Sequence, residues 1–264
     1  MDLRLKDKVV LITGGSKGIG FHTARAFAEE GCHVGICARS QEDLQHAVEK
    51  LRSKGSRVTA VQADVCKPED ASRLVSQCVT QLGGIDILVN NVGSSFGGNL
   101  MESNDEDWQR TFDVDLFQIV RMIRLAVPHM RKRGGGSIVN IASISGWEPQ
   151  LAGVGQYGSS KAANIFLTER LALELVRYNI RVNTLSPGSI IWPGGFWDEF
   201  RKGHPESFAA YVCDGFPMGR LGKPEEVADV IVFLASPRAN WINGRHIPVD
   251  GLEQPIPVGK DKPW

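Results

Sequence analysis

The 264-residue chain has no excess charge of either sign, because 30 lysines and arginines balance 30 aspartates and glutamates. A strongly basic or acidic surface for nucleic acid or a charged membrane is therefore not expected. The chain also has no apolar run of about 18 residues and no signal-peptide core at its start. We therefore expect no nucleic-acid partner and no membrane partner.

Cysteine is scarce and irregularly placed. The chain has five cysteines without metal-ligand spacing, at Cys32, Cys37, Cys66, Cys78 and Cys213. Reduced, mostly packed thiols of this kind are typical of a cytosolic protein, so we expect a cytoplasmic location and no metal site. Internal repeats, low-complexity tracts and interdomain linkers are missing as well. With 42% hydrophobic residues, residues 1–264 are predicted to form one α/β domain with a sizeable core.

Short apolar runs alternate with amphipathic stretches along the chain. The runs that predict strands are 9–12, 33–37, 57–62, 85–90, 137–141, 181–185 and 246–249. Helices are predicted near 18–30, 41–54, 68–82, 105–132, 157–178 and 224–235. This alternation is typical of a doubly wound parallel sheet with helices on both faces. In such a sheet the ligand binds at the carboxyl ends of the strands.

A glycine-rich turn follows the first apolar run. Gly14, Gly18 and Gly20 have the spacing GxxxGxG, and a helix is predicted to begin within this turn. Glycines let the backbone turn tightly and approach a pyrophosphate, which binds the free N–H groups of the helix N-terminus. An ordinary strand-to-helix turn is the alternative interpretation. The order of strand, glycine turn and helix favours a dinucleotide site.

Tyr157 and Lys161 are four residues apart in a predicted helix, so their side chains share one face. An ammonium beside a phenol favours the charged form of the phenol and eases proton exchange near neutral pH. An isolated pair of this kind is more often a half-buried ring beside a solvated amine. The glycine-rich turn, together with Ser143 upstream, favours a catalytic role here.

These motifs together resemble the short-chain dehydrogenase/reductase family, and its 3-oxoacyl-[acyl-carrier-protein] reductases in particular. Further motifs that carry the resemblance are Asp64-Val65, Asn90-Asn91-Val92-Gly93, Asn140-Ile141-Ala142-Ser143 and Ser186-Pro187-Gly188. The resemblance covers nearly the whole chain and implies a single-domain Rossmann-like fold with seven parallel strands. It also implies a substrate lid over about 189–222, followed at the end of the chain by a tail over 253–264.

The resemblance implies the catalytic roles. Tyr157 is the expected acid in reduction and base in oxidation, Lys161 stabilises the phenolate and holds the nicotinamide ribose, and Ser143 hydrogen-bonds the substrate oxygen. Ser145 is a weaker candidate for the serine. Asp115 aligns with the family's asparagine, which holds a water of the proton relay. The Asp115 carboxylate would raise the pKa of Lys161 if the two residues lie close. The alternative interpretation is that Asp115 is an ordinary helix residue hydrogen-bonded to backbone or water.

The resemblance also implies which residues hold the dinucleotide. They are Gly14, Ser16, Lys17, Gly18, Ile19, Gly20, Arg39, Asp64, Val65, Asn91, Val92, Gly93, Tyr157, Lys161, Pro187, Gly188 and Ile190. Many relatives have a threonine where Trp192 stands, so we expect the contact of that threonine to come from another residue.

The end of the second predicted strand bears on the choice of coenzyme. NAD-preferring relatives carry an acid there, which binds the ribose 2′-hydroxyl and repels a 2′-phosphate. Ala38 takes that place here, Arg39 follows it, and Lys17 adds a cation from the glycine turn. Solvated surface cations are the ordinary alternative. The missing acid favours NADP(H) over NAD(H).

Aromatic residues gather between 189 and 222, which favours an apolar pocket wall over plain packing. Three functions stay open: an NADP(H)-dependent oxidoreductase acting on a ketone or 3-oxoacyl-type substrate, an NAD-linked dehydrogenase of a sugar, steroid or cyclic alcohol, and a non-catalytic dinucleotide-binding sensor. The presence of Ser143, Tyr157 and Lys161 argues against the third, and the missing acid at Ala38 favours the first over the second. The resemblance implies that the helices that carry Asp115 and Tyr157 pair across a two-fold axis, and their apolar sets agree with this, so we expect a homotetramer, with a homodimer second.

Overall fold

A computed structural model describes residues 1–52, 56–149 and 155–254. One parallel sheet contains seven strands in the order β3-β2-β1-β4-β5-β6-β7, as the resemblance implied. The strands are β1 (Val9–Thr13), β2 (His33–Ala38), β3 (Val58–Gln62), β4 (Ile87–Asn90), β5 (Gly136–Ile141), β6 (Ile180–Pro187) and β7 (His246–Val249). The predicted strands are confirmed, with ends that differ by a few residues at most.

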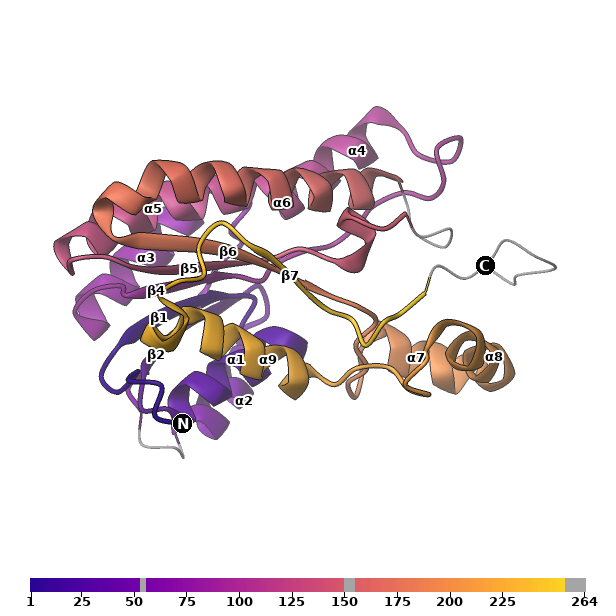
Figure 1. Cartoon of the computed structure of the whole chain (residues 1–264), viewed down its shortest axis with the longest axis horizontal. Coiled ribbons are helices and arrows are strands. Elements are labelled where there is room, and N and C mark those ends of the chain that lie inside the picture. The colour runs from indigo at the N-terminus through magenta and orange to yellow at the C-terminus, as the bar shows by residue number, and fades with distance from the viewer. Residues whose placement is uncertain (53–55, 150–154, 255–264) are drawn as a thin grey trace.

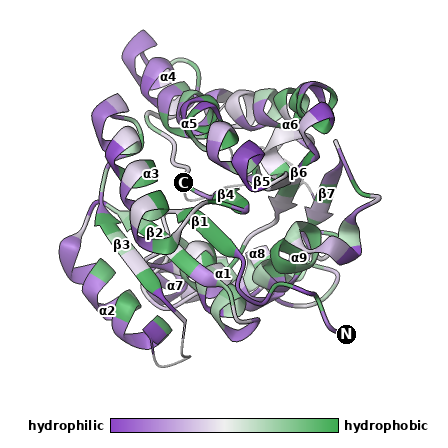
Figure 2. Ribbon diagram, turned by 90° about the vertical axis from the view of Figure 1, so that its left-hand side faces the viewer, coloured by the Kyte–Doolittle hydropathy of each residue, from purple (hydrophilic) through white to green (hydrophobic). Residues whose placement is uncertain are grey.

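Helices cover both faces of this sheet (Figure 1). They are α1 (Gly18–Glu29), α2 (Gln41–Arg52), α3 (Pro68–Leu82), α4 (Asp105–Phe112), α5 (Gln118–Lys132), α6 (Gly155–Leu175), α7 (Phe196–Gly203), α8 (Pro205–Gly215) and α9 (Pro224–Ala235). In Figure 2, α3, α5 and α6 lie on one side of the strands, whereas α1, α2 and α9 lie on the other. No helix in the described ranges is long and apolar enough to cross a membrane.

The strands are apolar on both faces because each face contributes to a separate hydrophobic core. In β1, Val10 and Ile12 pack into the core formed with α1 and α9, and Val9 and Leu11 pack into the core formed with α3 and α5. Successive side chains of a strand point to opposite faces, so a strand covered on both sides reads as a continuous apolar run. This is why the strands could be predicted from short apolar runs.

The prediction of one helix over 105–132 was wrong in one respect. A π-helix, Asp113–Phe117, separates α4 from α5. A π-helical turn contains one residue more than an α-helical turn and is often found at functional sites. The side chain of Asp115, the middle residue of this π-helix, is buried.

Polar side chains align the carboxyl ends of the central strands. The amide nitrogen of Asn90 donates to Asn140 at 2.8 Å, and the amide nitrogen of Asn140 donates to Thr168 of α6 at 2.9 Å. All three residues are buried, so each hydrogen bond compensates a polar group removed from water. The bonds hold β4, β5 and α6 in a fixed relation where the site is expected.

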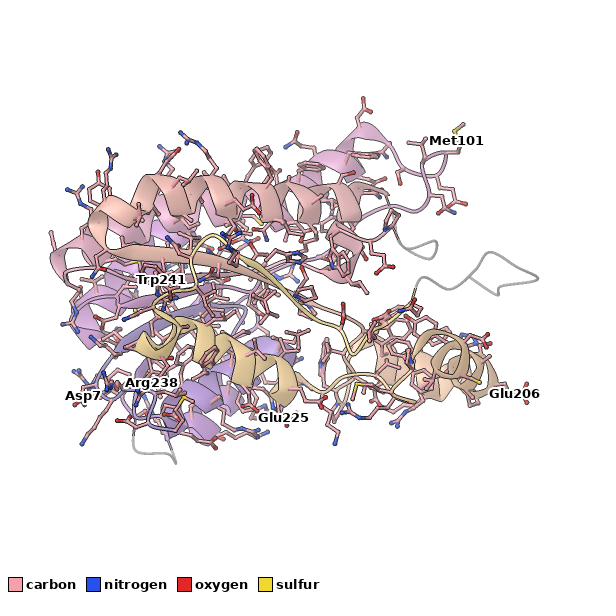
Figure 3. The ribbon with its side chains drawn as sticks, in the orientation of Figure 1. Asp7, Met101, Glu206, Glu225, Arg238 and Trp241 are labelled. Carbon is pink, nitrogen blue, oxygen red and sulfur yellow. The ribbon has the colours of Figure 1, made fainter. Side chains whose placement is uncertain are left out.

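The segment between β6 and α9 projects beyond the sheet. Figure 3 shows Glu206 of α8 at the opposite end of the molecule from Asp7. The segment begins and ends at one narrow neck, where Gly222 donates to the Ser189 carbonyl and Ile191 donates to the Gly222 carbonyl. A small cluster of its own, built around Tyr211, Phe216 and Leu221, lies apart from the two main cores. We call residues 192–221 the lid segment.

Candidate active site

The order of strands reverses between β1 and β4, which leaves a crevice at their carboxyl ends. The motifs singled out in the sequence meet at this edge. The glycine turn follows β1, Asn91 follows β4, Ser143 follows β5, and Pro187 ends β6. The structure therefore brings the predicted catalytic residues and most of the predicted dinucleotide-binding residues to one side of the sheet.

Asp115 and Lys161 form a buried ion pair. The Nζ atom of Lys161 lies 3.1 Å from Oδ1 of Asp115, and their side chains are 2% and 0% exposed. Burial disfavours the lysine ammonium, but attraction by Asp115 and Tyr157 outweighs it, so the pKa of Lys161 is raised. The expected effect of a nearby carboxylate on Lys161 is confirmed. Two opposite charges at this depth stabilise each other far more than they would in water.

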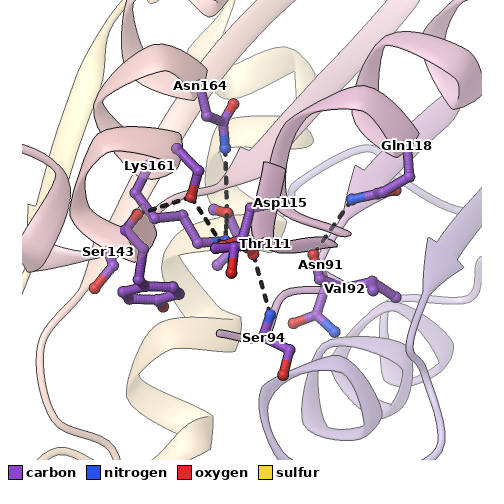
Figure 4. Close-up of polar contacts among 12 residues, drawn as sticks. Asn91, Val92, Ser94, Thr111, Asp115, Gln118, Ser143, Lys161 and Asn164 are labelled. Carbon is purple, nitrogen blue, oxygen red and sulfur yellow. Dashed lines mark hydrogen bonds and ion pairs between the residues drawn. The ribbon is translucent and has the colours of Figure 1, made fainter. Parts of the chain in front are cut away.

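Neighbouring groups fix both ends of this pair. Asp115 accepts hydrogen bonds from the Ser160 hydroxyl at 2.9 Å and from the Ser94 backbone N–H at 3.1 Å, while Lys161 also donates to the Ile141 carbonyl at 3.3 Å (Figure 4). A methyl group added at Gly93 would lie 2.7 Å from Nζ of Lys161, so the backbone passes directly over the pair. The pair is therefore held in one geometry by groups from several elements.

Tyr157 lies beside this pair on the same face of α6. The Nζ atom of Lys161 is 5.4 Å from the centroid of the tyrosine ring, which is half-buried. Ser143 is also half-buried, and its Oγ accepts a hydrogen bond from the Ser145 backbone N–H at 3.2 Å. Ser143 thus begins the short 3₁₀-helix Ile144–Gly146, which turns the chain at the end of β5.

The glycine turn has the shape that a dinucleotide pyrophosphate requires. Gly14 and Gly18 have φ values of +67° and +52°, which other residues rarely adopt. A methyl group added at Gly20 would lie 2.2 Å from the Gly14 carbonyl oxygen. No side chain caps the first turn of α1, so its N–H groups are available to an anion. Ser16 and Ile19 lie in this turn and are half-buried.

Asn91 braces the turn from the neighbouring strand. Its amide nitrogen donates to the carbonyls of Thr13 and Gly14, at 3.0 and 3.2 Å, and its backbone N–H donates to the Thr13 hydroxyl. Val92, the next residue, would be 3.0 Å from a methyl group at Gly14. These hydrogen bonds explain why an asparagine follows β4, since its side chain and backbone both bind the glycine turn.

Residues at the ends of β2 and β3 border the same crevice. Arg39 is exposed, and Ala38 stands at the end of β2. Lys17 is paired with Asp43 of α2, at 2.9 Å, and this hydrogen bond lowers the pKa of Asp43. Asp64 accepts a hydrogen bond from the Cys66 backbone N–H. Val65 is buried below it.

Trp192 lies over the glycine turn. A methyl group added at Gly18 would be 3.0 Å from an indole carbon, so this ring lies where the lid segment leaves β6 and approaches α1. Ile190 and Pro187 are buried nearby, and Gly188 is half-buried. Where many relatives have a threonine, Trp192 therefore places its indole ring against one side of the glycine turn.

Several residues that shape the site were missed in the sequence analysis. They are Asp43, Ser94, Ser160 and Glu253. Only Ser160 had a local indication, because it directly precedes Lys161 in the predicted helix. The other three reach the site only because the fold brings segments that are distant in the sequence together, and no local sequence pattern indicates such contacts. Arg201 and Lys202 of the lid segment are both paired with Asp198.

Comparisons with known proteins agree with this geometry. The family model described as enoyl-(acyl carrier protein) reductase matches residues 14–251. Dehydrogenase/reductase SDR family member 4 from Oryctolagus cuniculus is 40% identical over 250 residues, which cover 94% of each chain. The Homo sapiens protein of the same name is 39% identical and covers 94% of this chain and 87% of its own.

Solved structures are similar as well. L-sorbose reductase from Gluconobacter frateurii, complexed with NADPH and L-sorbose, superposes with a TM-score of 0.89 at 38% identity, covering 95% of this chain and 98% of its own. A 7α-hydroxysteroid dehydrogenase complexed with NADH and 7-oxo glycochenodeoxycholic acid gives a TM-score of 0.88 at 31% identity, covering 96% and 97%.

The chain belongs to the short-chain dehydrogenase/reductase family. It is therefore an oxidoreductase that acts on CH–OH or C=O groups by hydride transfer.

Proposed function

We propose that this protein is a cytoplasmic, homo-oligomeric NADP(H)-dependent reductase of ketones or 3-oxoacyl-type substrates, with Tyr157 as the acid and base. The observation that carries the proposal is the buried Asp115–Lys161 pair beside Tyr157, at the edge of the sheet where the glycine turn lies. A non-catalytic sensor has no need of a charged pair at this depth, since burying charges is costly.

Each residue has a distinct part in the proposed reaction. When bound, the coenzyme supplies or accepts the hydride at its nicotinamide ring. During reduction the carbonyl oxygen of the substrate gains negative charge, which Ser143 stabilises by a hydrogen bond and Tyr157 neutralises by donating its proton. Lys161 holds positive charge 5.4 Å from the tyrosine ring centroid and so stabilises the phenolate that remains. Asp115 holds that lysine in place through their ion pair.

The proposed dinucleotide site follows the crevice. The glycine turn and the N-terminus of α1 hold the pyrophosphate, with Ser16, Lys17 and Ile19 contributing from the same turn. Asp64 and Val65 border the adenine. Val92 and Gly93 line the nicotinamide side from β4, and Pro187, Gly188 and Ile190 line it from β6.

Charge supports the preference for NADP(H). No acid stands at Ala38, the end of β2, and Arg39 is exposed beside it. A guanidinium binds a phosphate through two parallel hydrogen bonds. The L-sorbose reductase complexed with NADPH is a similar structure. Asp43 acts against this preference, because it engages Lys17 and places a negative charge in the same region.

An NAD-linked dehydrogenase of a steroid, sugar or cyclic alcohol is the second candidate. It is supported by the similar hydroxysteroid dehydrogenase complexed with NADH. The aromatic lid segment, in which Trp197 stacks on Tyr211 with ring centroids 4.5 Å apart, suits a steroid or another apolar substrate better than a sugar. Parallel kinetics with NADPH and NADH on a panel of ketones separates the two candidates.

Replacement of Tyr157 by phenylalanine tests the chemistry. The variant keeps the ring but loses the transferable proton, so kcat of ketone reduction should fall by roughly 10²–10⁴-fold. The Kd for NADPH, measured by fluorescence titration, should change little. Tyr178→Phe is the matched control, because Tyr178 packs against Arg131 at the opposite end of β6. Full activity in Tyr157→Phe would remove Tyr157 from this role.

A further inference from the structure

Glu253 is a buried acid that the proposed reaction does not use. It follows β7, in the segment that runs from the sheet toward α7 and α8 (Figure 1), and only 4% of it is exposed. A carboxyl group is almost never buried to this extent without partners, because the loss of hydration is costly. Its partners therefore indicate what it does.

Three hydrogen bonds join Glu253 to two separate segments. Its Oε2 accepts from the Ser189 backbone N–H at 2.6 Å, and its Oε1 accepts from the Ser189 hydroxyl at 2.9 Å. The Tyr211 hydroxyl donates to the same Oε1 at 2.9 Å. The hydroxyls of Ser189 and Tyr211 are also within 2.9 Å of each other, which closes a ring of polar contacts.

One of these segments borders the proposed nicotinamide site. Ser189 directly follows Gly188, and a methyl group added at Gly188 would lie 2.6 Å from Oε2 of Glu253. The carboxylate therefore packs against the backbone of the Pro187-Gly188 motif from the side of the C-terminal segment. Movement of Glu253 would move the residues that line the nicotinamide side of the crevice.

The other segment is the lid. Tyr211 lies on α8, where its ring stacks on Trp197 of α7, and it is buried in the small cluster of the lid segment. The backbone N–H of Gln254 donates to the carbonyl of Gly215, the last residue of α8. The C-terminal segment is thus fastened to the lid by backbone and side-chain bonds together.

We propose that Glu253 is a positioning residue that fixes the lid helix α8 relative to the nicotinamide side of the crevice. Its carboxylate sets the distance between Ser189 and Tyr211, and so determines how closely the aromatic wall approaches the reacting carbonyl. We call the hydrogen bonds of Glu253 with Ser189 and Tyr211 the latch. Its effect on catalysis rests on the proposed function, but the latch itself is present in the protein without coenzyme. Burial raises the pKa of Glu253, although the bonds from Ser189 and Tyr211 counteract this.

Hydrogen exchange and tryptophan fluorescence test the latch without any substrate. In Glu253→Ala and Glu253→Gln, amides of 205–216 and 189–191 should exchange at least about tenfold faster, the change expected from losing one hydrogen bond to a charged group. Amides of α1 and α3 should exchange as in the wild type. Emission from Trp197 should change, because Tyr211 stacks on it. Tyr211→Phe removes one hydroxyl and should give the same effects more weakly.

Kinetics then tests the positioning role. In the Glu253 variants the KM for the ketone should rise about tenfold, with a smaller change in kcat and in the Kd for NADPH. Gln254→Ala is the control, since within the described residues that exposed side chain bonds to the Leu252 carbonyl, two residues earlier, and not to the lid segment. Unchanged exchange at 189–191 and 205–216, or an unchanged KM in an active enzyme, overturns the inference. A wild type without reductase activity contradicts the proposed function instead, and the latch is then decided by exchange alone.

Discussion

The Asp115–Lys161 pair determines how strongly the lysine acts on Tyr157. An ammonium favours a neighbouring phenolate, but a carboxylate 3.1 Å from the ammonium offsets that charge. An asparagine in place of Asp115, as in the relatives that the sequence resembles, would leave the lysine charge uncompensated. The Asp115 carboxylate therefore weakens the electrostatic stabilisation of the Tyr157 phenolate by Lys161, and it also holds the Lys161 side chain more firmly in place.

Replacement of Asp115 by asparagine should consequently change the pH profile of alcohol oxidation. Tyr157 and the Ile141 carbonyl still favour the Lys161 ammonium in this variant, and no carboxylate offsets its charge, so the phenolate should form at lower pH and the half-maximal rate should move down by about one pH unit. The measurement is kcat against pH with a saturating alcohol, with urea unfolding to check that the variant is folded.

The control is Asp113→Asn, in the same π-helix. Asp113 accepts a hydrogen bond from Gln109 at 3.0 Å and is only half-buried, so its replacement should leave the pH profile in place. An unchanged or higher midpoint in Asp115→Asn would show that the carboxylate does not act on the tyrosine through Lys161.

Local sequence patterns predicted the helices and strands but not all of the contacts that their side chains make. Tyr157 and Lys161 were predicted to share a face because helical periodicity determines it. Asp115 lies in the π-helix Asp113–Phe117, and no residue pattern in that stretch indicates the extra residue of a π turn. The pairing of Lys17 with Asp43 joins α1 and α2 across the turn after β2, so it required the three-dimensional arrangement.

The C-terminal end of β2 should control the choice between coenzymes. Ala38→Asp combined with Arg39→Leu adds an acid at the expected 2′-phosphate position and removes its cation. Preference should shift toward NADH by on the order of 1–3 kcal/mol, the range for a charge-assisted hydrogen bond. The ratio of kcat/KM for NADPH and NADH measures the change.

Asp43→Asn is the opposing variant for that experiment. It releases Lys17 from its 2.9 Å ion pair, so preference for NADPH should increase. A wild type that already favours NADH would contradict the assignment of the 2′-phosphate position before any variant is made.

The two cores are well covered within one chain, but the outer face of α6 is not. Phe166 and Leu173, separated by two helical turns, are 74% and 71% exposed. Phe117, at the end of the π-helix before α5, is 45% exposed. Of these three exposed residues, only Leu173 belongs to the apolar sets from which a partner contact was predicted, and Ile119, Ile123 and Leu175 of those sets belong to the core. Exposed apolar patches of this kind commonly mark contacts between protein chains.

Sedimentation equilibrium at micromolar concentration should therefore detect a homotetramer, or a homodimer as the second choice. Phe166→Glu combined with Leu173→Glu should shift the assembly toward smaller species, because charges replace apolar contacts. Met101→Glu, at a residue that is 93% exposed in the loop before α4, is the control and should leave the assembly intact. A wild-type mass near 28.9 kDa, that of one chain, would contradict the prediction.

The neck of the lid segment has a consequence for how new substrate ranges arise. Both ends of residues 192–221 meet at the paired backbones of Ser189 and Gly222, and the lid segment is held to the C-terminal segment by the bonds of Tyr211 with Glu253 and of Gly215 with Gln254. Segments whose ends meet in this way tolerate replacement and insertion with little cost to the remaining fold. Grafting the corresponding segment of a relative between these points, with the tyrosine that bonds to Glu253 retained, would exchange the substrate wall while the hydride-transfer residues stay in place. Selection can then diversify the compounds that are accepted without altering the chemistry performed on them.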